Sequence, residues 1–308
     1  MHPRRWIPLA AGVAGMSTWS IVHWRSPAVR NWRQSTLPLR RIGRLTTRIG
    51  GSGTTAVLLL HGLVATGDVF ATTPDALAVD HRVAVPDLLG FGRSVDETAT
   101  AFATVDHLAA IDAVVEELGD QPPLAIGAHS MGSGLALRYA AAHPSRVHKV
   151  VCIGAPIWRS PEAARAAISA AGPMARAFLL DERVAERLCR FNCAHRSLSG
   201  LIAAAVAPRW PVPVARQASL HTWSAYQQAI TDQVIEVDWK ALLGRLDDAG
   251  IQVSLLWGAE DLIGDVEYAR ELTAHFANLE VVRIARADHT LPSSQPDLLV
   301  RALKGAPE

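Results

Sequence analysis

The chain has 308 residues, of which 49% are hydrophobic and 19% are charged. It is therefore long enough for one large globular domain with an insertion, or for two domains. Its net charge of +1 argues against a general affinity for nucleic acid or another polyanion. The three cysteines are too few and too irregularly spaced for a disulfide framework, and no cysteine and histidine cluster has zinc-ligand spacing. We expect neither a metal nor a cofactor.

We interpret residues 1–50 as a basic, tryptophan-rich N-terminal arm. Nine arginines and no acidic residue precede Asp68, so the rest of the chain carries about eight net negative charges. Within the arm, residues 6–24 form an uncharged stretch of 19 residues with tryptophan at both ends, flanked by Arg5 and Arg25. A stretch of this length is just long enough to cross a bilayer, and tryptophan favours the level of the lipid headgroups.

Several interpretations of residues 6–24 stay open. The stretch can be a signal peptide that is removed, a single membrane anchor, or an interfacial segment on an anionic membrane surface. Its proline, glycine and serine residues weaken it as a membrane span, and a flexible basic leader without any membrane role is the fourth alternative. We expect a membrane-associated or exported protein, with a cytoplasmic protein as the alternative.

From residue 51 onward, short apolar runs alternate with longer helical patterns. Six runs are rich in valine, leucine and isoleucine and lack polar alternation, which is typical of buried parallel strands: 56–60, 82–85, 124–126, 149–153, 252–257 and 279–284. Helical patterns lie between and after these runs, at 105–118, 134–142, 266–276 and 296–303. This alternation predicts an α/β fold whose parallel sheet has helices on both faces.

Residues 157–238 interrupt the alternation. They contain no strand pattern, are rich in alanine, and hold helical stretches at 161–171, 175–190, 198–207 and 219–231. We interpret this segment as a helical cap over the strand ends, inserted into a core that consists of residues 51–156 and 239–308. Its apolar side chains, such as Phe178 and Trp223, either line an acyl pocket or simply pack the cap.

Ser130 is the strongest candidate nucleophile. It lies between a strand pattern and a helical pattern, and the small residues Ala128 and Gly132 stand two positions to either side. Small residues at these positions are typical of a nucleophile elbow, a sharp turn that presents a serine hydroxyl above a sheet. An ordinary serine near a helix N-terminus is the alternative interpretation.

A serine nucleophile needs a base, and the base needs an orienting acid. In an open parallel sheet, functional groups gather at the carboxyl ends of the strands, which restricts the candidates to residues just after strand patterns. His289 follows the last strand pattern and Asp261 follows the one before it. Glu260 and Asp265 are rival acids nearby. The chain order is then serine, aspartate, histidine.

An acyl-transfer reaction also needs hydrogen-bond donors for its oxyanion. We assign this role to the backbone amides of Leu63 and Met131. Gly62 lets the chain turn after a strand pattern, which brings the next amide to the site. Met131 opens the helix after the elbow, so its amide lies at the positive end of the helix dipole.

Together these motifs resemble the α/β-hydrolase superfamily, in particular its capped serine esterase- and lipase-like branch. The matching motifs occur in the family's order, around His61-Gly62, residues 86–94, Ser130, Asp261 and His289. The resemblance implies an α/β-hydrolase fold: a mostly parallel, eight-stranded sheet flanked by helices, with a helical cap insertion. Ala128 and Asp288 stand where the family often has glycine. Asp288 adds a negative charge beside the base and can compete for its ring hydrogen bond.

The sequence therefore predicts a serine hydrolase that cleaves small-molecule carboxylic esters through an acyl-enzyme on Ser130. Apolar or medium-chain acyl groups are the expected substrates, and a membrane surface is a further expected partner through the N-terminal arm. Capped relatives with the same triad also suit C–C bond hydrolysis, thioester cleavage or cofactor-free perhydrolysis. A ligand-binding or signalling module without catalysis is the alternative from another class. The sequence leaves the oligomeric state open.

Overall fold

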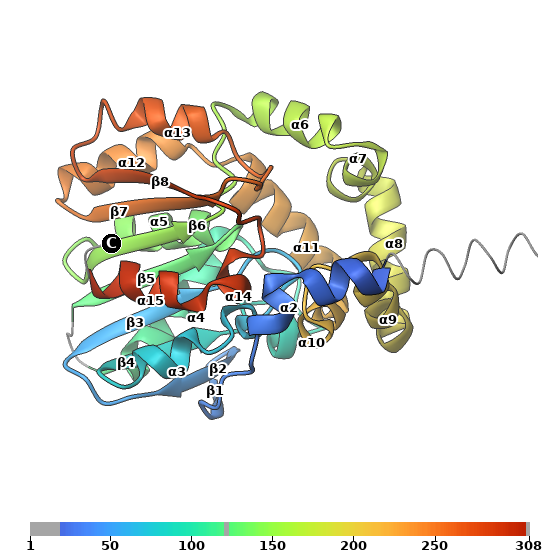
Figure 1. Cartoon of the computed structure of the whole chain (residues 1–308), viewed down its shortest axis with the longest axis horizontal. Coiled ribbons are helices and arrows are strands. Elements are labelled where there is room, and N and C mark those ends of the chain that lie inside the picture. Colours follow the sequence, from blue (N-terminus) through green and yellow to red (C-terminus); the bar gives the residue numbers. More distant parts are fainter. Residues whose placement is uncertain (1–18, 120–122, 306–308) are drawn as a thin grey trace, which may run out of the picture.

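The computed structural model describes residues 19–119 and 123–305 (Figure 1). Within these residues, eight strands form one sheet in the order β1-β2-β4-β3-β5-β6-β7-β8. The strands are β1 (Leu39–Ile42), β2 (Leu45–Gly50), β3 (Thr55–Leu60), β4 (His81–Pro86), β5 (Leu124–His129), β6 (Val147–Ile153), β7 (Gln252–Gly258) and β8 (Leu279–Ile284). Strand β2 pairs antiparallel with β1 and β4, and all other neighbours are parallel. The predicted mostly parallel, eight-stranded sheet is confirmed.

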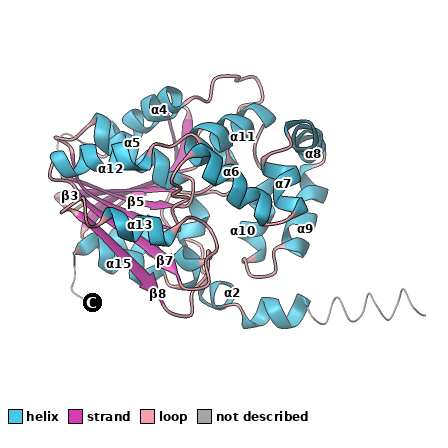
Figure 2. Ribbon diagram, turned by 90° about the horizontal axis from the view of Figure 1, so that it is seen from above, coloured by secondary structure: helices cyan, strands magenta, loops and turns pink. Residues whose placement is uncertain are grey.

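Helices cover both faces of the sheet (Figure 2). One face packs against α4 (Thr104–Glu117), α5 (Gly132–Ala142), α12 (Trp239–Asp248) and α13 (Val266–Leu272). The other face packs against α3 (Thr73–Leu77) and α15 (Pro296–Lys304). Successive side chains of a strand point to opposite faces, so the central strands must be apolar throughout.

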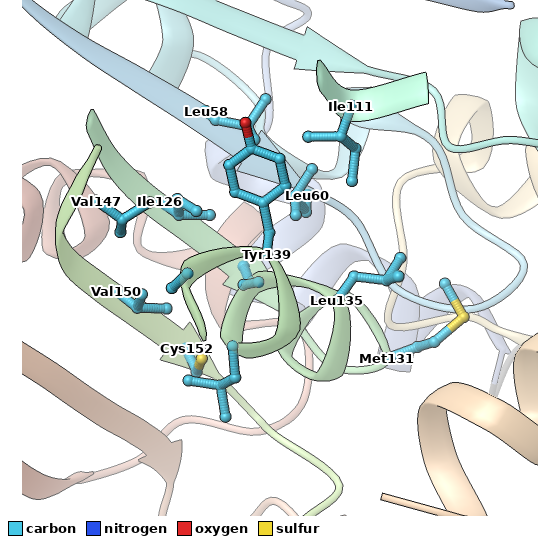
Figure 3. Packing of buried hydrophobic residues seen from close by; sticks show 14 of the residues in the cluster. Leu58, Leu60, Ile111, Ile126, Met131, Leu135, Tyr139, Val147, Val150 and Cys152 are labelled. Carbon is cyan, nitrogen blue, oxygen red and sulfur yellow. The ribbon is translucent and has the colours of Figure 1, made fainter. Parts of the chain in front are cut away.

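Strand β3 illustrates this two-sided burial. Leu58 and Leu60 belong to the cluster beneath α4 and α5, whereas Val57 and Leu59 belong to the cluster on the opposite face. Figure 3 shows the first cluster, in which Tyr139 of α5 lies beside Leu58 and Leu60. The uninterrupted apolar runs of the sequence are therefore a direct consequence of a sheet that is covered on both sides.

The N-terminal arm departs from the prediction. We expected residues 1–50 to lie outside the core, but residues 39–50 form β1 and β2 of the sheet. Strand β2 contains Arg48, which is buried because both of its outer nitrogens find partners: it pairs with the Asp68 carboxylate at 3.0 Å and donates to Leu37 O at 2.9 Å. A buried charge is tolerated only when it is paired in this way.

The chain ahead of β1 packs onto the rest of the molecule. Residues 19–25 are helical and are followed by α2 (Pro27–Asn31). The ring Nδ1 of His23 donates to Pro208 O at 2.9 Å, the Ser26 hydroxyl donates to Arg209 O at 2.6 Å, and Asn31 Nδ2 donates to Ser294 O at 2.7 Å. The expected membrane or signal segment at 6–24 lies outside the described residues up to position 18. In the part of the chain that the structure describes, no helix is long and apolar enough to span a bilayer.

The segment between β6 and β7 is mainly helical and contains no strand of the sheet. It forms α6 (Pro161–Ala170), α7 (Pro173–Leu179), α8 (Glu182–Ala194), α9 (Arg196–Val206), α10 (Val212–Arg216), α11 (Trp223–Ile230) and a π-helical turn at Thr231–Ile235. The single helix that we predicted at 175–190 is two helices, because the Asp181 side chain accepts a hydrogen bond from Val184 N at 3.1 Å and so starts α8 afresh.

Candidate active site

Ser130 occupies a strained turn between β5 and α5. Its backbone φ is +52°, which costs a non-glycine residue about 1 kcal/mol. The Ser130 amide donates to Ile153 O at 2.8 Å, which fixes the turn against β6. Gly132 is required here, because a Cβ at this position would lie 2.5 Å from Leu60 O. This is the geometry expected of a nucleophile elbow.

Ala128 fits the turn in spite of its methyl group. It is fully buried in β5, in register with Leu60 of β3 and Cys152 of β6. Its side chain belongs to the cluster beneath α5, where the strand needs apolar volume. The departure from glycine therefore adds packing and leaves the turn at Ser130 intact.

The structure brings Asp261 and His289 together. Asp261 follows β7, His289 follows β8, and His289 Nδ1 donates to Asp261 Oδ2 at 2.8 Å. The other oxygen of the carboxylate accepts from Ile263 N at 2.9 Å, and the Asp261 side chain is only 1% exposed. The carboxylate is thus held in one orientation. The bond also leaves Nε2 of His289, whose side chain is 29% exposed, as the nitrogen that can accept a proton.

The other acidic residues of this region have different roles. The Asp265 carboxylate starts α13 by accepting from Tyr268 N at 2.9 Å. Asp288 does not compete for the histidine ring, because Oδ1 accepts from Thr290 N at 2.9 Å and Oδ2 accepts from Arg209 Nη1 at 2.7 Å. Burial raises the pKa of Asp288, but the hydrogen bonds from Thr290 and Arg209 outweigh it and lower the pKa.

His129 holds the backbone of His289, a role that sequence reasoning missed. Its Nε2 donates to His289 O at 3.1 Å, and the two rings lie 4.6 Å apart. Burial, with a smaller contribution from His289, lowers the pKa of His129 well below 6.5, so the ring is neutral at physiological pH. The turn that bears His289 therefore reaches the residue immediately before Ser130.

Two glycines make room for these side chains. A Cβ on Gly62 would lie 2.9 Å from Ser130 Cβ, so the loop after β3 runs against the serine. Gly154, which sequence reasoning also missed, has a φ of +59° and lies directly after β6. A Cβ there would lie 2.8 Å from His289 Nδ1 and 2.9 Å from Asp261 Oδ2. A glycine directly after a strand pattern is the signal that would have found it.

The backbone amides of Leu63 and Met131 are the predicted oxyanion donors. Within residues 19–119 and 123–305, neither amide donates a backbone hydrogen bond. The loop of Leu63 is held by His61, whose Nδ1 donates to Gly62 O at 2.8 Å and whose Nε2 accepts from Leu88 N at 2.8 Å. Burial lowers the pKa of His61, so the ring stays neutral and keeps both bonds.

Buried charges fix the neighbouring loops. The Asp68 carboxylate pairs with Arg48 at 3.0 Å and with Arg93 at 2.5 Å, and it accepts from Gln217 Nε2 at 2.7 Å. Gln217 follows α10, so this cluster ties the helical segment to the loop after β3. Asp87 has a structural role, because it accepts from the amides of Gly67 and Arg93 at 2.9 and 2.8 Å.

A cavity of about 230 Å³ lies within the helical segment. Its lining combines apolar and aromatic residues, such as Phe178 and Trp223, with the charged or polar residues Arg165, Glu182 and Gln227. Leu201 of the same segment is exposed and lies outside the lining of this cavity. Among the described residues, no cluster of three or more His, Cys, Asp or Glu side chains could hold a metal ion.

Comparisons with known proteins agree with this architecture. The family model described as "alpha/beta hydrolase fold" matches residues 55–294. The chain is similar to "Lipase LipV" of Mycobacterium tuberculosis, with 34% identity over 34% of this chain and 39% of that protein. It is also similar to "Probable lysophospholipase BODYGUARD 5" of Arabidopsis thaliana, with 24% identity over 76% of this chain and 57% of that protein. The chain thus spans less than two thirds of these curated relatives.

Solved structures show the same fold. A bromoperoxidase from Bacillus anthracis superposes with a TM-score of 0.65 at 20% identity, covering 87% of this chain and 98% of that one. E-2-(acetamidomethylene)succinate hydrolase superposes with a TM-score of 0.65 at 21% identity, again over 87% of this chain and 98% of the other.

Proposed function

Because this chain belongs to the α/β hydrolase fold family, we propose that it is a serine hydrolase that cleaves carboxylic esters. The observation that carries the proposal is the hydrogen bond of 2.8 Å between His289 Nδ1 and Asp261 Oδ2, next to the strained turn at Ser130. A strained backbone at a side chain that can act as a nucleophile supports a catalytic role.

The mechanism follows from the order of these groups. The Ser130 hydroxyl attacks the ester carbonyl carbon and gives its proton to His289 Nε2. Asp261 keeps the other proton on Nδ1 and stabilises the imidazolium that forms. The Leu63 and Met131 amides donate to the oxyanion. His289 then protonates the leaving alcohol, and it activates the water that hydrolyses the acyl-enzyme.

Acyl esters with apolar or medium-length chains are the substrate class that we propose. Apolar side chains of the helical segment, such as Phe178 and Trp223, support this choice, since an acyl chain gains about 0.8 kcal/mol for each methylene that they bury. The curated relatives named above are a lipase and a probable lysophospholipase, which also favours acyl esters.

A fluorophosphonate probe tests the nucleophile. We expect the probe to label the folded wild-type protein and not the Ser130→Ala variant. Ser133→Ala is the matched control, because Ser133 is a buried serine three residues further along, and it should be labelled like the wild type. Turnover of p-nitrophenyl esters of increasing chain length then defines the acyl preference, and Ser130→Ala should lower kcat by about 10⁴-fold or more.

Two results would contradict the proposal. A folded wild-type protein that the probe does not label would favour a non-catalytic ligand-binding module. Labelled wild-type protein that turns over thioesters or C–C bonds but no oxygen ester would keep the nucleophile and replace the substrate class.

A further inference from the structure

Helix α9 presents large apolar side chains to solvent. Four of them are exposed: Leu198, Leu201, Ile202 and Val206. Leu201 is 55% exposed and Val206 is 65% exposed. Their spacing of three to four residues places them on one side of the helix. The opposite side packs inward through small residues: Ser199, Gly200 and Ala204. An amphipathic helix of a globular domain normally buries its larger apolar residues, so the exposed side of α9 is a candidate interaction surface.

The helix at residues 19–25 extends this apolar surface. Trp24 is 69% exposed and Ile21 is exposed beside it. His23 donates to Pro208 O at 2.9 Å, two residues after the end of α9, so the two helices approach each other at that point. Figures 1 and 2 both place the helix at 19–25 and α9 at the same end of the molecule.

Both segments of this surface are free of acidic residues. Residues 19–33 contain three arginines and residues 187–206 contain three, and neither range contains aspartate or glutamate. Arg190 is paired with Glu186 of its own helix α8, and Arg196 is paired with Glu97. Within the described residues, Arg25, Arg30 and Arg187 form no ion pair with an acidic side chain and face the solvent. The surface therefore combines apolar side chains with unneutralised positive charge.

We propose that the face formed by residues 19–33 and 187–206 docks on the surface of an anionic lipid bilayer. The apolar side chains of α9 and Trp24 would lie at the boundary between headgroups and acyl chains, and the arginines would contact lipid phosphates. A second copy of the chain is a poorer partner, because two positively charged faces repel each other. The proposal does not depend on catalysis at Ser130.

Vesicle cosedimentation with the full-length chain tests the docking face. We expect binding to phosphatidylcholine vesicles that contain about one third phosphatidylglycerol, and at least about tenfold weaker binding to phosphatidylcholine alone. Leu201→Ser combined with Ile202→Ser should lower the partition coefficient on the anionic vesicles by about tenfold. Val79→Ser combined with Val105→Ser is the matched control, since both valines are exposed on other elements, and it should bind like the wild type.

Three results would overturn the proposal. Equal partitioning of the Leu201→Ser/Ile202→Ser variant and the wild type would remove α9 from the docking face. Equal binding to neutral and anionic vesicles would remove the role of the arginines. A dimer in light scattering that the α9 variant abolishes would identify a second copy as the occupant. Thermal unfolding of each variant checks that it is folded, and this measurement does not require enzyme activity.

Discussion

Gly154→Ala is the substitution that tests the site geometry most directly. The new Cβ would lie 2.8 Å from His289 Nδ1 and 2.9 Å from Asp261 Oδ2, closer than carbon contacts occur in folded proteins. The backbone at Gly154 has a φ of +59°, so alanine also adopts an unfavourable conformation there. The histidine ring or the carboxylate must move, and the hydrogen bond between them lengthens or breaks.

The magnitude has two parts. The left-handed backbone costs alanine about 1 kcal/mol. Loss of a buried hydrogen bond to a charged group adds about 2 kcal/mol, so the free energy of unfolding should fall by about 3 kcal/mol. Displacement of a catalytic group by about 1 Å costs on the order of 10²-fold in rate, so kcat/KM for a p-nitrophenyl ester should fall by about that factor.

Gly250→Ala is the control for the backbone term. Gly250 has a φ of +69°, and no atom lies within 4 Å of the position that a Cβ would take. This variant therefore has the energetic cost of the left-handed backbone without any steric contact. Its free energy of unfolding, measured by urea denaturation, should be about 1 kcal/mol lower than that of the wild type, and its activity should be unchanged. If Gly154→Ala and Gly250→Ala lost the same stability and both stayed active, the close approach of Gly154 to the histidine and aspartate would be refuted.

Two further predictions concern buried charge. Asp68→Asn leaves Arg48 buried beside a neutral amide, so the free energy of unfolding at pH 7 should fall by about 3 to 5 kcal/mol in urea denaturation. Burial raises the pKa of Asp68, but hydrogen bonds from Arg93 and Gln217 bring it below the ordinary 3.8. The ionised carboxylate therefore stabilises the fold fully above that pH and loses this effect in stronger acid. The free energies of unfolding of wild type and variant should converge there. Burial lowers the pKa of His107 from 6.5 to about 4. The unfolded chain therefore binds a proton at this residue before the folded protein does, and the free energy of unfolding should fall by up to about 3 kcal/mol as the pH falls from 6.5 to about 4. His107→Leu should flatten this pH dependence, and an unchanged slope would contradict the assignment.

The core of the fold could be predicted because each central strand is buried on both faces. Uninterrupted apolar runs such as the one in β3 follow from that burial. Strands β1 and β2 gave no such signal, because three of the four residues of β1 are exposed and β2 contains Arg48. Arg48 can be buried in a strand only because it pairs with Asp68. The local hydrophobicity pattern contains no information about such a distant partner.

The candidate site was predictable to the extent that it depends on strand ends. Ser130, Asp261 and His289 each follow a strand, and their chain order placed them at one edge of the sheet. Gly154 had a local signal, its position directly after a strand, whereas His129 was missed because its role comes from a contact between distant segments. The hydrogen bond from His129 to His289 joins residues 160 positions apart. The oxyanion role of Leu63 and Met131 stays a prediction.

The N-terminal segment is an integral part of the packed molecule. The family match begins at residue 55, yet Ala28 is fully buried. Ser26 bonds to the backbone of Arg209 in the helical segment, and Asn31 bonds to the backbone of Ser294, shortly after His289. A chain trimmed to the family boundary would lose two strands and both of these ties. The segment in front of the sheet is therefore packed against the same part of the molecule as the turn that bears His289.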